Sequence, residues 1–186
     1  MRVHTRGRIM AISISIFLAI MFVIPFLYPY GSFIGLDGHV GVLDSTDKVA
    51  FADPISRIMY GIGDAICHQE QARSLILNGS QTVFCHRDMG ILMGVATGFY
   101  IFFDRRFLKY LSKRENVFVG YKGENKVISR IVDKQILLSG VLLTTITLVE
   151  WLIEFTTFMD LPVARVVTGI ISGVGVAMIM QWAVTR

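Results

Sequence analysis

Four long apolar stretches constrain the fold of this chain more than any other feature of its sequence. They cover residues 9–30, 82–103, 135–158 and 163–184, and the second is apolar from Met89 onward. A helix needs about 20 apolar residues to cross the roughly 30 Å of hydrocarbon in a bilayer. Because the chain is also 53% hydrophobic and only 17% charged, we expect an all-α integral membrane protein. Residues 1–186 would form a single membrane domain with four transmembrane helices.

The distribution of charge predicts the orientation of these helices. The first eight residues include three arginines, and residues 104–134 contain nine Lys or Arg against four acids, whereas residues 31–81 contain six acids against three bases. Cytoplasmic loops carry an excess of basic residues. We therefore expect a multi-pass protein of the cell membrane with both termini and the 104–134 loop in the cytoplasm. Basic residues do not alternate with aromatic ones along a face, so the expected partner is the lipid bilayer and not nucleic acid.

One further apolar segment, about residues 54–77, is less suited to crossing the membrane. Its apolar residues recur at helical spacing from Ile55 to Ile76, but Arg57 and Asp64 interrupt it. Apolar residues three or four positions apart indicate an amphipathic helix. We therefore expect an outer amphipathic or re-entrant helix that begins near Pro54.

Cysteine and histidine side chains are concentrated at the outer ends of the predicted helices. Cys67 and His68 fall late on the amphipathic helix, and Cys85 lies at the outer end of the second span. Thiolate and imidazole groups are common ligands of zinc and similar divalent metals. This makes Cys67, His68 and Cys85 the candidate metal ligands. A site of three or four ligands would combine the two cysteines with His68, Asp88 or Glu150.

Two other interpretations of the cysteines remain open. Both thiols are expected on the outer, oxidising side, where a Cys67–Cys85 disulfide would stabilise the fold by roughly 3 kcal/mol in the chain-entropy model. Alternatively, the two thiols are inert or redox-active. The sequence is compatible with a zinc-like divalent metal, with a disulfide and with free thiols.

The charged residues inside the apolar stretches share one depth. Glu150 and Glu154 lie one helical turn apart near the outer end of the third span, and Arg165 lies near the outer end of the fourth. Ionisable groups within a membrane usually face a protein interior or a water-filled cavity, which makes them candidates for function. We therefore expect an outward-facing polar site that includes Asp88, Glu150 and Arg165.

Glycine spacing predicts which spans pack together. Two ladders of glycines spaced four residues apart are Gly90, Gly94 and Gly98 on the second span and Gly169 and Gly173 on the fourth. Small residues at this spacing allow helix backbones to approach closely. If the two ladders meet, Asp88 and Arg165 lie at one level and can form an ion pair. Between copies of the chain, the same ladders would support a homo-oligomer or a larger membrane complex.

Two groups of residues resemble the predicted membrane protein family known as domain of unknown function 2085. The first is a CHQ…RS…GxQ…CxRDxGI pattern ahead of a span, and the second combines an acidic residue, an arginine and TGxxxG. The residues that carry the resemblance are Cys67, His68, Gln69, Arg73, Ser74, Gly79, Gln81, Cys85, Arg87, Asp88, Gly90, Glu150, Arg165, Thr168, Gly169 and Gly173. The resemblance covers about residues 55–175 and implies the fold and the position of the site, but no reaction.

The chain departs from the family pattern at two places. Phe-Cys-His-Arg at residues 84–87 stands where Pro-Val-Cys-Ala-Arg is expected, and Glu-Trp at residues 150–151 stands where Asp-Gly is expected. Both departures lie within the predicted polar site.

Three functions fit this site, and whether the chain is an enzyme stays open. We favour a small polytopic membrane protein that acts as a metal-dependent enzyme on a lipid-linked or small polar anionic substrate. Asp88 and Glu150 would be its catalytic residues. Guanidinium groups bind phosphate and carboxylate through paired hydrogen bonds. The substrate-binding residues would therefore be Arg73, Arg87 and Arg165, together with Gln69.

The other two functions belong to different classes. In one, the chain is an ion or small-solute transporter or channel subunit whose charges line a pathway. In the other, it is a structural subunit with an outer cap stapled by a Cys67–Cys85 disulfide. The sequence contains no Walker loop, Rossmann glycine pattern, HExxH or GxSxG motif, so nucleotide-driven transport and the common hydrolase machineries lack support.

Overall fold

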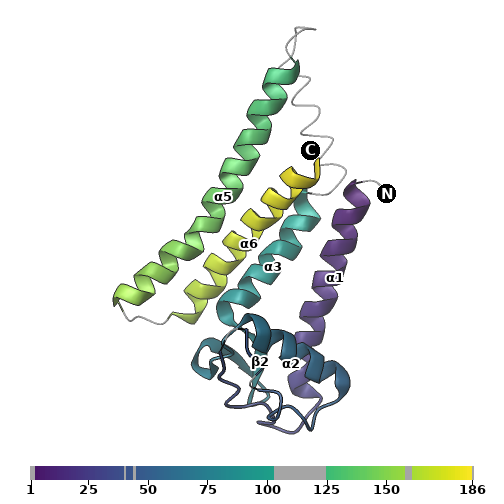
Figure 1. The fold of residues 1–186 in the computed structure, drawn as a ribbon, viewed down its shortest axis with the longest axis vertical. Helices are drawn as coiled ribbons and strands as arrows, with labels where there is room; N and C mark the ends of the chain where they lie inside the picture. The colour runs from purple at the N-terminus through teal and green to yellow at the C-terminus, as the bar shows by residue number, and fades with distance from the viewer. Residues whose placement is uncertain (1–2, 40, 44, 103–124, 158–160, 186) are drawn as a thin grey trace.

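Long helices and a small cap at one end make up the described part of the protein. The computed structural model describes residues 3–39, 41–43, 45–102, 125–157 and 161–185. Within these residues, the long helices are α1 (Val3–Val23), α3 (His86–Phe102), α5 (Asn125–Thr157) and α6 (Pro162–Thr185). Figure 1 shows the cap at one end of the helices and both ends of the chain near the other.

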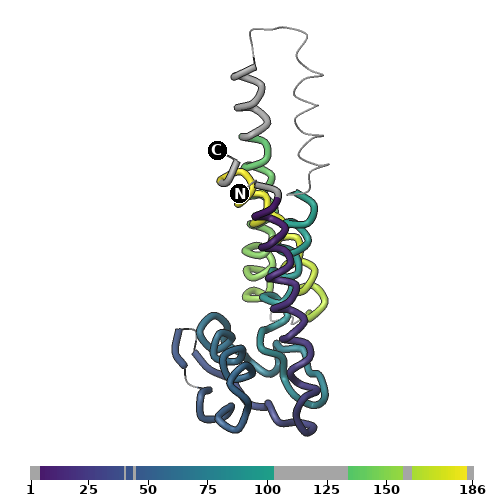
Figure 2. The backbone as a smooth tube through the Cα atoms, turned by 90° about the vertical axis from the view of Figure 1, so that its right-hand side faces the viewer, coloured from purple at the N-terminus to yellow at the C-terminus, as the bar shows by residue number. Residues whose placement is uncertain are grey.

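The four helices stand in a row in the order α1, α3, α6, α5. Helix α3 packs against α1 and α6, and α6 packs against α5. Seen from the side, the helices overlap in one narrow column, so the bundle is a single layer (Figure 2). Along the chain the helices alternate in direction, so the cap, residues 27–85, which connects α1 to α3, lies at the same end of the bundle as the end of α5 and the start of α6.

Three helical segments in the described residues are long and apolar enough to cross a membrane. They are Thr5–Phe26, Lys134–Thr156 and Pro162–Ala183. The expected second span, residues 82–103, is not confirmed, because its first residues form a strand and α3 is described over 17 residues. The expected cytoplasmic loop 104–134 lies outside the described residues as far as residue 124, and residues 125–134 belong to α5.

The predicted contact between the two glycine ladders is confirmed. A Cβ atom added to Gly90 would lie less than 3.0 Å from the backbone oxygen of Val166, and one added to Gly173 would lie equally close to that of Ile91. Side chains larger than hydrogen would therefore force the two backbones apart. Close backbone packing of this kind is how small residues hold helices together in lipid.

The cap, residues 27–85, contains strands as well as a helix. It consists of α2 (Pro54–Ile66), a short 3-10 helix η2 (Gln71–Arg73) and the antiparallel strands β1 (Ser74–Leu77) and β2 (Ser80–Cys85). The expectation of an all-α fold is therefore wrong for this part of the chain. The outer helix expected over about 54–77 is confirmed only as far as Ile66.

Local sequence explains where α2 begins and ends. Pro54 occupies the first turn, and the carboxylate of Asp53 accepts hydrogen bonds from the backbone N–H groups of Ile55 and Ser56, which caps the helix. At the other end, Cys67 is extended and Gln69 has a φ of 47°. A left-handed residue cannot continue an α-helix, so the chain turns there toward the strands.

A two-residue turn joins the strands. Leu77 pairs with Ser80, which leaves Asn78 and Gly79 as the turn, and their φ angles are 49° and 69°. Asn-Gly is the preferred pair for a hairpin turn with two left-handed residues. The side-chain amide of Asn78 also donates hydrogen bonds to the carbonyl oxygens of Pro25 and Tyr28, which ties the hairpin to the end of α1.

Buried aromatic and amide side chains hold the cap together. Tyr60 on α2 stacks on Phe33 with ring centroids 4.4 Å apart, and its hydroxyl donates to the carbonyl oxygen of Gln81 on β2. The buried amide of Gln69 donates to the carbonyl oxygens of Tyr60 and Val83. These bonds fix α2 against β2, and they thereby bring the end of α2 close to the end of β2.

Candidate functional site

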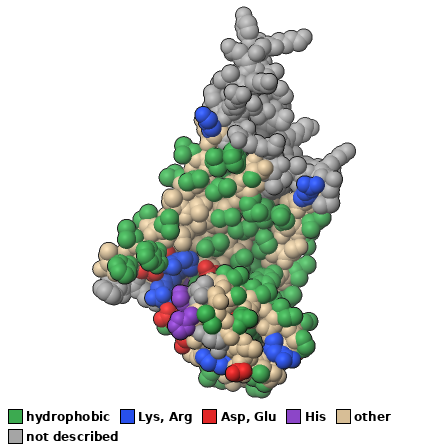
Figure 3. Space-filling view, viewed as in Figure 1, with side chains coloured by type: hydrophobic (Ala, Val, Ile, Leu, Met, Phe, Trp, Pro, Cys, Tyr) green, Lys and Arg blue, Asp and Glu red, His purple; other side chains and the backbone are tan. Residues whose placement is uncertain are grey.

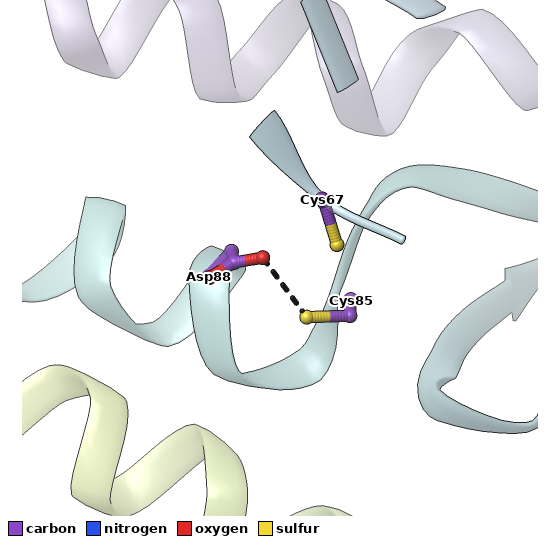
Figure 4. Close-up of side chains that lie close together, drawn as sticks. All are labelled: Cys67, Cys85 and Asp88. Carbon is purple, nitrogen blue, oxygen red and sulfur yellow. Dashed lines mark hydrogen bonds between the residues drawn. The ribbon is translucent and has the colours of Figure 1, made fainter. Parts of the chain in front are cut away.

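Three potential metal ligands meet where the cap joins the helices. Cys67 follows the last residue of α2, Cys85 ends β2, and Asp88 lies in the first turn of α3. The two sulfur atoms and a carboxylate oxygen of Asp88 all lie within 4.8 Å of one another (Figure 4). In the structure both cysteines are free thiols, and the sulfur of Cys85 donates a hydrogen bond of 3.0 Å to Oδ2 of Asp88.

The backbone holds each of the three residues in place. The N–H of Cys67 donates to the carbonyl oxygen of Gly63 in the last turn of α2 at 2.7 Å. Cys85 pairs with Ser74 across the two strands. Asp88 stands on the helix whose glycines are packed against α6. The cluster therefore joins the end of β2 and the start of α3 to the residue that follows α2.

The two thiols differ in their affinity for a proton. The hydrogen bond with Cys85, followed by burial, raises the pKa of the Cys67 thiol, whereas the hydrogen bond from Cys67 lowers the pKa of Cys85. Cys85 is consequently the first of the pair to become a thiolate. A thiolate is the form of cysteine that binds metals.

A polar pocket of about 210 Å³ opens beside the cluster. It brings together seven of the predicted site residues: Cys67, His68, Arg73, Cys85, Arg87, Asp88 and Arg165. Figure 3 shows basic, acidic and histidine side chains gathered on this face, at the junction of the cap and the helices. Most of the predicted site residues therefore share one pocket, although they come from the segment after α2, from η2, from β2, and from α3 and α6.

Two predicted site residues lie elsewhere. Gln69 does not line the pocket, because its side chain is buried in the cap and bonded to the backbone of Tyr60 and Val83. Glu150 lies behind Arg87 and lines a second cavity between α5 and α6. His68 does line the pocket, but its Nδ1 lies 3.2 Å from the carbonyl oxygen of Gly38. His68, Asp88 and Glu150 were the candidates for a third ligand beside the two cysteines. The cluster contains Asp88.

An ion-pair network borders the pocket on its membrane side. The guanidinium of Arg87 contacts Oε2 of Glu150 at 2.8 Å and Oε2 of Glu154 at 2.7 Å, and Arg165 pairs with Glu154. The four side chains are between 4% and 20% exposed. The shared depth expected for these charges is confirmed. Glu154 was not among the predicted site residues, although its position one turn after Glu150 pointed to it.

All three candidate anion-binding arginines have carboxylate partners. Arg73 pairs with Glu70 at 3.0 Å, and Arg87 and Arg165 pair with the glutamates of α5. Their positive charge is therefore balanced within the protein. Asp88 and Arg165 line the same pocket, and the expected ion pair between them stays a prediction.

Comparison with known proteins supports the resemblance seen in the sequence. Residues 67–179 match the family described as predicted membrane protein (DUF2085). The chain belongs to this family. No curated protein and no solved structure matches the chain. The matched segment begins at Cys67 and includes Cys85, Asp88 and the ion-pair network, so the candidate site lies within the part of the chain that matches the family.

The cluster offers three ligand atoms that could hold a metal ion. Zinc binds thiolate sulfur at about 2.3 Å, which places two sulfur ligands about 3.8 Å apart in a tetrahedral site. The three ligand atoms of the DUF2085 cluster lie within 4.8 Å of one another, so they would have to approach by up to about 1 Å to reach that spacing. Two thiolates and one carboxylate suit zinc or a similar metal. Three protein ligands leave the fourth position open to water or substrate, as in catalytic zinc sites.

Proposed function

We propose that this DUF2085 protein is a membrane metalloprotein that binds a zinc-like divalent metal through Cys67, Cys85 and Asp88. The observation that carries the proposal is the meeting of three ligand atoms within 4.8 Å, from the residue after α2, the end of β2 and the first turn of α3. The hydrogen bond from Cys67, which lowers the pKa of the Cys85 thiol, supports it as well, because it favours the thiolate form that binds metals.

We further propose that the metal serves a membrane enzyme. Cys67, Cys85 and Asp88 would hold the metal, and a metal with three protein ligands would activate a coordinated water. Asp88 then acts as a ligand, and Glu150 acts through Arg87 as a positioning residue. Arg73 is the best candidate to contact an anionic substrate, because its side chain is 51% exposed beside the pocket.

We place the pocket on the outer face of the cell membrane. The charge asymmetry of the loops supports this orientation, because the chain segment 31–81 is acidic and 104–134 is basic. A reporter fused at Asp44 should be external and one fused at Gly120 cytoplasmic. The opposite result for either fusion would reverse the orientation without affecting the metal site.

Metal content and thiol reactivity, measured on the purified protein, test the proposal. Cys67→Ser, Cys85→Ser and Asp88→Asn should each lower the bound metal, and both thiols should resist alkylation until a chelator is added. Glu70→Gln is the matched control, because Glu70 lines the same pocket but is not part of the cluster. A chelator-insensitive block of the thiols that reductant releases would instead establish a disulfide and overturn the metal site.

A further inference from the structure

A second cavity lies between α5 and α6, on the far side of the ion-pair network. It has a volume of about 550 Å³, and it runs along α5 from Leu142 to Glu154 and along the start of α6 from Leu161 to Thr168. Most of its lining is apolar, and Leu142, Val149 and Ile153 are more than half exposed. Because Lys134–Thr156 and Pro162–Ala183 are candidate membrane spans, this groove opens toward lipid.

The length and polarity of the groove match one leaflet of a bilayer. At about 1.5 Å per residue, the distance from Leu142 to Glu154 is roughly 18 Å, compared with about 15 Å for half of a hydrocarbon core. The two glutamates stand at its cap end, and the remainder is apolar apart from Thr145 and Thr168. An amphiphile would therefore fit with its polar end toward the cap and its chain toward the membrane centre.

One carboxylate oxygen at the polar end has no hydrogen-bond donor. Both oxygens of Glu154 contact guanidinium groups, and Oε2 of Glu150 contacts Arg87. Within the described residues, Oε1 of Glu150 is buried and has no hydrogen-bond partner. The hydroxyls of Thr145 and Thr168 already donate to backbone carbonyl oxygens of their own helices. A buried acceptor without a donor is costly, and a bound molecule that carries a donor would relieve this cost.

The charge of the network restricts the head group. Arg87 and Arg165 carry two positive charges and the two glutamates carry two negative ones, so the network has no net formal charge. An added phosphate or carboxylate would lie beside the acceptor oxygen of Glu150 and be repelled. A neutral hydroxyl meets the need for a donor without adding charge.

We infer that the groove between α5 and α6 binds a neutral lipid alcohol, with its hydroxyl donating to Oε1 of Glu150 and its chain lying along α5. This site is separate from the proposed metal cluster and does not depend on it. Arg87 lines the polar pocket and contacts Glu150. The Arg87–Glu150 ion pair would therefore separate the head group from that pocket.

Photolabelling in vesicles of a zwitterionic phospholipid tests the inference. The probes are a long-chain alcohol that carries a diazirine and the methyl ether of the same molecule, which differ only in the hydrogen-bond donor. We expect the alcohol to label the peptides of α5 and α6 that line the groove at about one tenth of the concentration that the ether needs. Equal labelling of the groove by alcohol and ether would overturn the inference, and this comparison requires no variant.

Two substitutions on neighbouring residues of α6 locate the label. Ala164→Phe fills the groove and should abolish labelling by the alcohol, whereas Val163→Phe should leave it unchanged, because Val163 is 76% exposed and does not line the groove. Labelling that persists in Ala164→Phe would mean that the probe binds elsewhere and would contradict the inference. Bound metal should be the same in both variants, so this result and the test of the metal site are independent.

Discussion

Arg87, in the first turn of α3, donates from its Nε to Oε2 of Glu150 on α5 across a distance of 2.9 Å, although 63 residues separate them in the chain. Helices α3 and α5 each pack against α6. The bond therefore connects two helices across a third, at the end of the bundle that carries the cap. It also separates the polar pocket from the groove, because Arg87 lines the former and Glu150 the latter.

Removing one partner of the Arg87–Glu150 pair should destabilise the protein more than removing both partners. Arg87→Met leaves Glu150 without its donor and Glu154 with Arg165 as its remaining partner, and we expect it to lower the free energy of unfolding by about 3 kcal/mol. Glu150→Gln should cost less, because the second glutamate still holds Arg87. In a double-mutant cycle measured in detergent, the double variant should lose less than the sum of the single losses. Strict additivity would show that the two side chains do not interact.

Close packing of α3 on α6 predicts a strong effect of adding one methyl group. Gly94→Ala would place a Cβ less than 3.0 Å from the backbone of Ile170, which should destabilise the protein by about 1–3 kcal/mol. Gly61→Ala is the control, because a Cβ there meets nothing within 4 Å. In the middle of α2 it should be neutral or stabilise by about 0.5–1 kcal/mol. Thermal unfolding in detergent compares the two, and equal effects would contradict the helix contact.

The hairpin turn provides a test of the cap. Gly79→Ala combines a left-handed φ of 69° with a Cβ only 2.6–2.7 Å from the ring of Tyr30. Gly35→Ala, at a φ of 62° with open space around it, should show the conformational cost alone, about 1–2 kcal/mol. We expect Gly79→Ala to lower the free energy of unfolding more than Gly35→Ala does. A smaller loss at Gly79 would mean that Tyr30 does not pack over the turn.

The stabilisation of α2 by its N-cap residue, Asp53, should be lost in acid. Hydrogen bonds from the hydroxyls of Ser56 and Tyr28 hold the pKa of Asp53 well below its ordinary value. A carboxylate with a lowered folded-state pKa stabilises the fold above the unfolded value of about 3.9, and this stabilisation is lost as the pH falls through the folded-state pKa. The difference in melting temperature between the protein and Asp53→Asn should therefore shrink below about pH 4. A difference that is independent of pH would contradict this role for Asp53.

Much of the helical part could be predicted because its signals are local. Apolar length identified α1, α5 and α6, and the spacing of Gly90 and Gly94 identified the contact with α6. The positions of Glu150 and Arg165 within their apolar stretches were sufficient to place both at one depth. Periodicity and length support such inferences, since a membrane allows few arrangements other than spanning helices.

The cap could not be predicted equally well, because its structure depends on contacts between distant residues. The strand pattern is short, and it follows an amphipathic run that favours a helix through Ile76. The pair Asn78-Gly79 is a hairpin signal, but the same pair also fits a plain turn between two helices. The role of Gln69 could not be foreseen either, because its partners Tyr60 and Val83 are set by the packing of α2 on β2.

X-ray absorption spectroscopy of the zinc-loaded protein tests the central claim most directly, because it reports the atoms bound to the metal. If the metal is bound by Cys67, Cys85 and Asp88, the first shell should contain two sulfur atoms at about 2.3 Å and oxygen at about 2.0–2.2 Å. Cys85→Ser should reduce the sulfur contribution to one atom, whereas Glu70→Gln should leave it at two. A first shell without sulfur would contradict the proposed metal site.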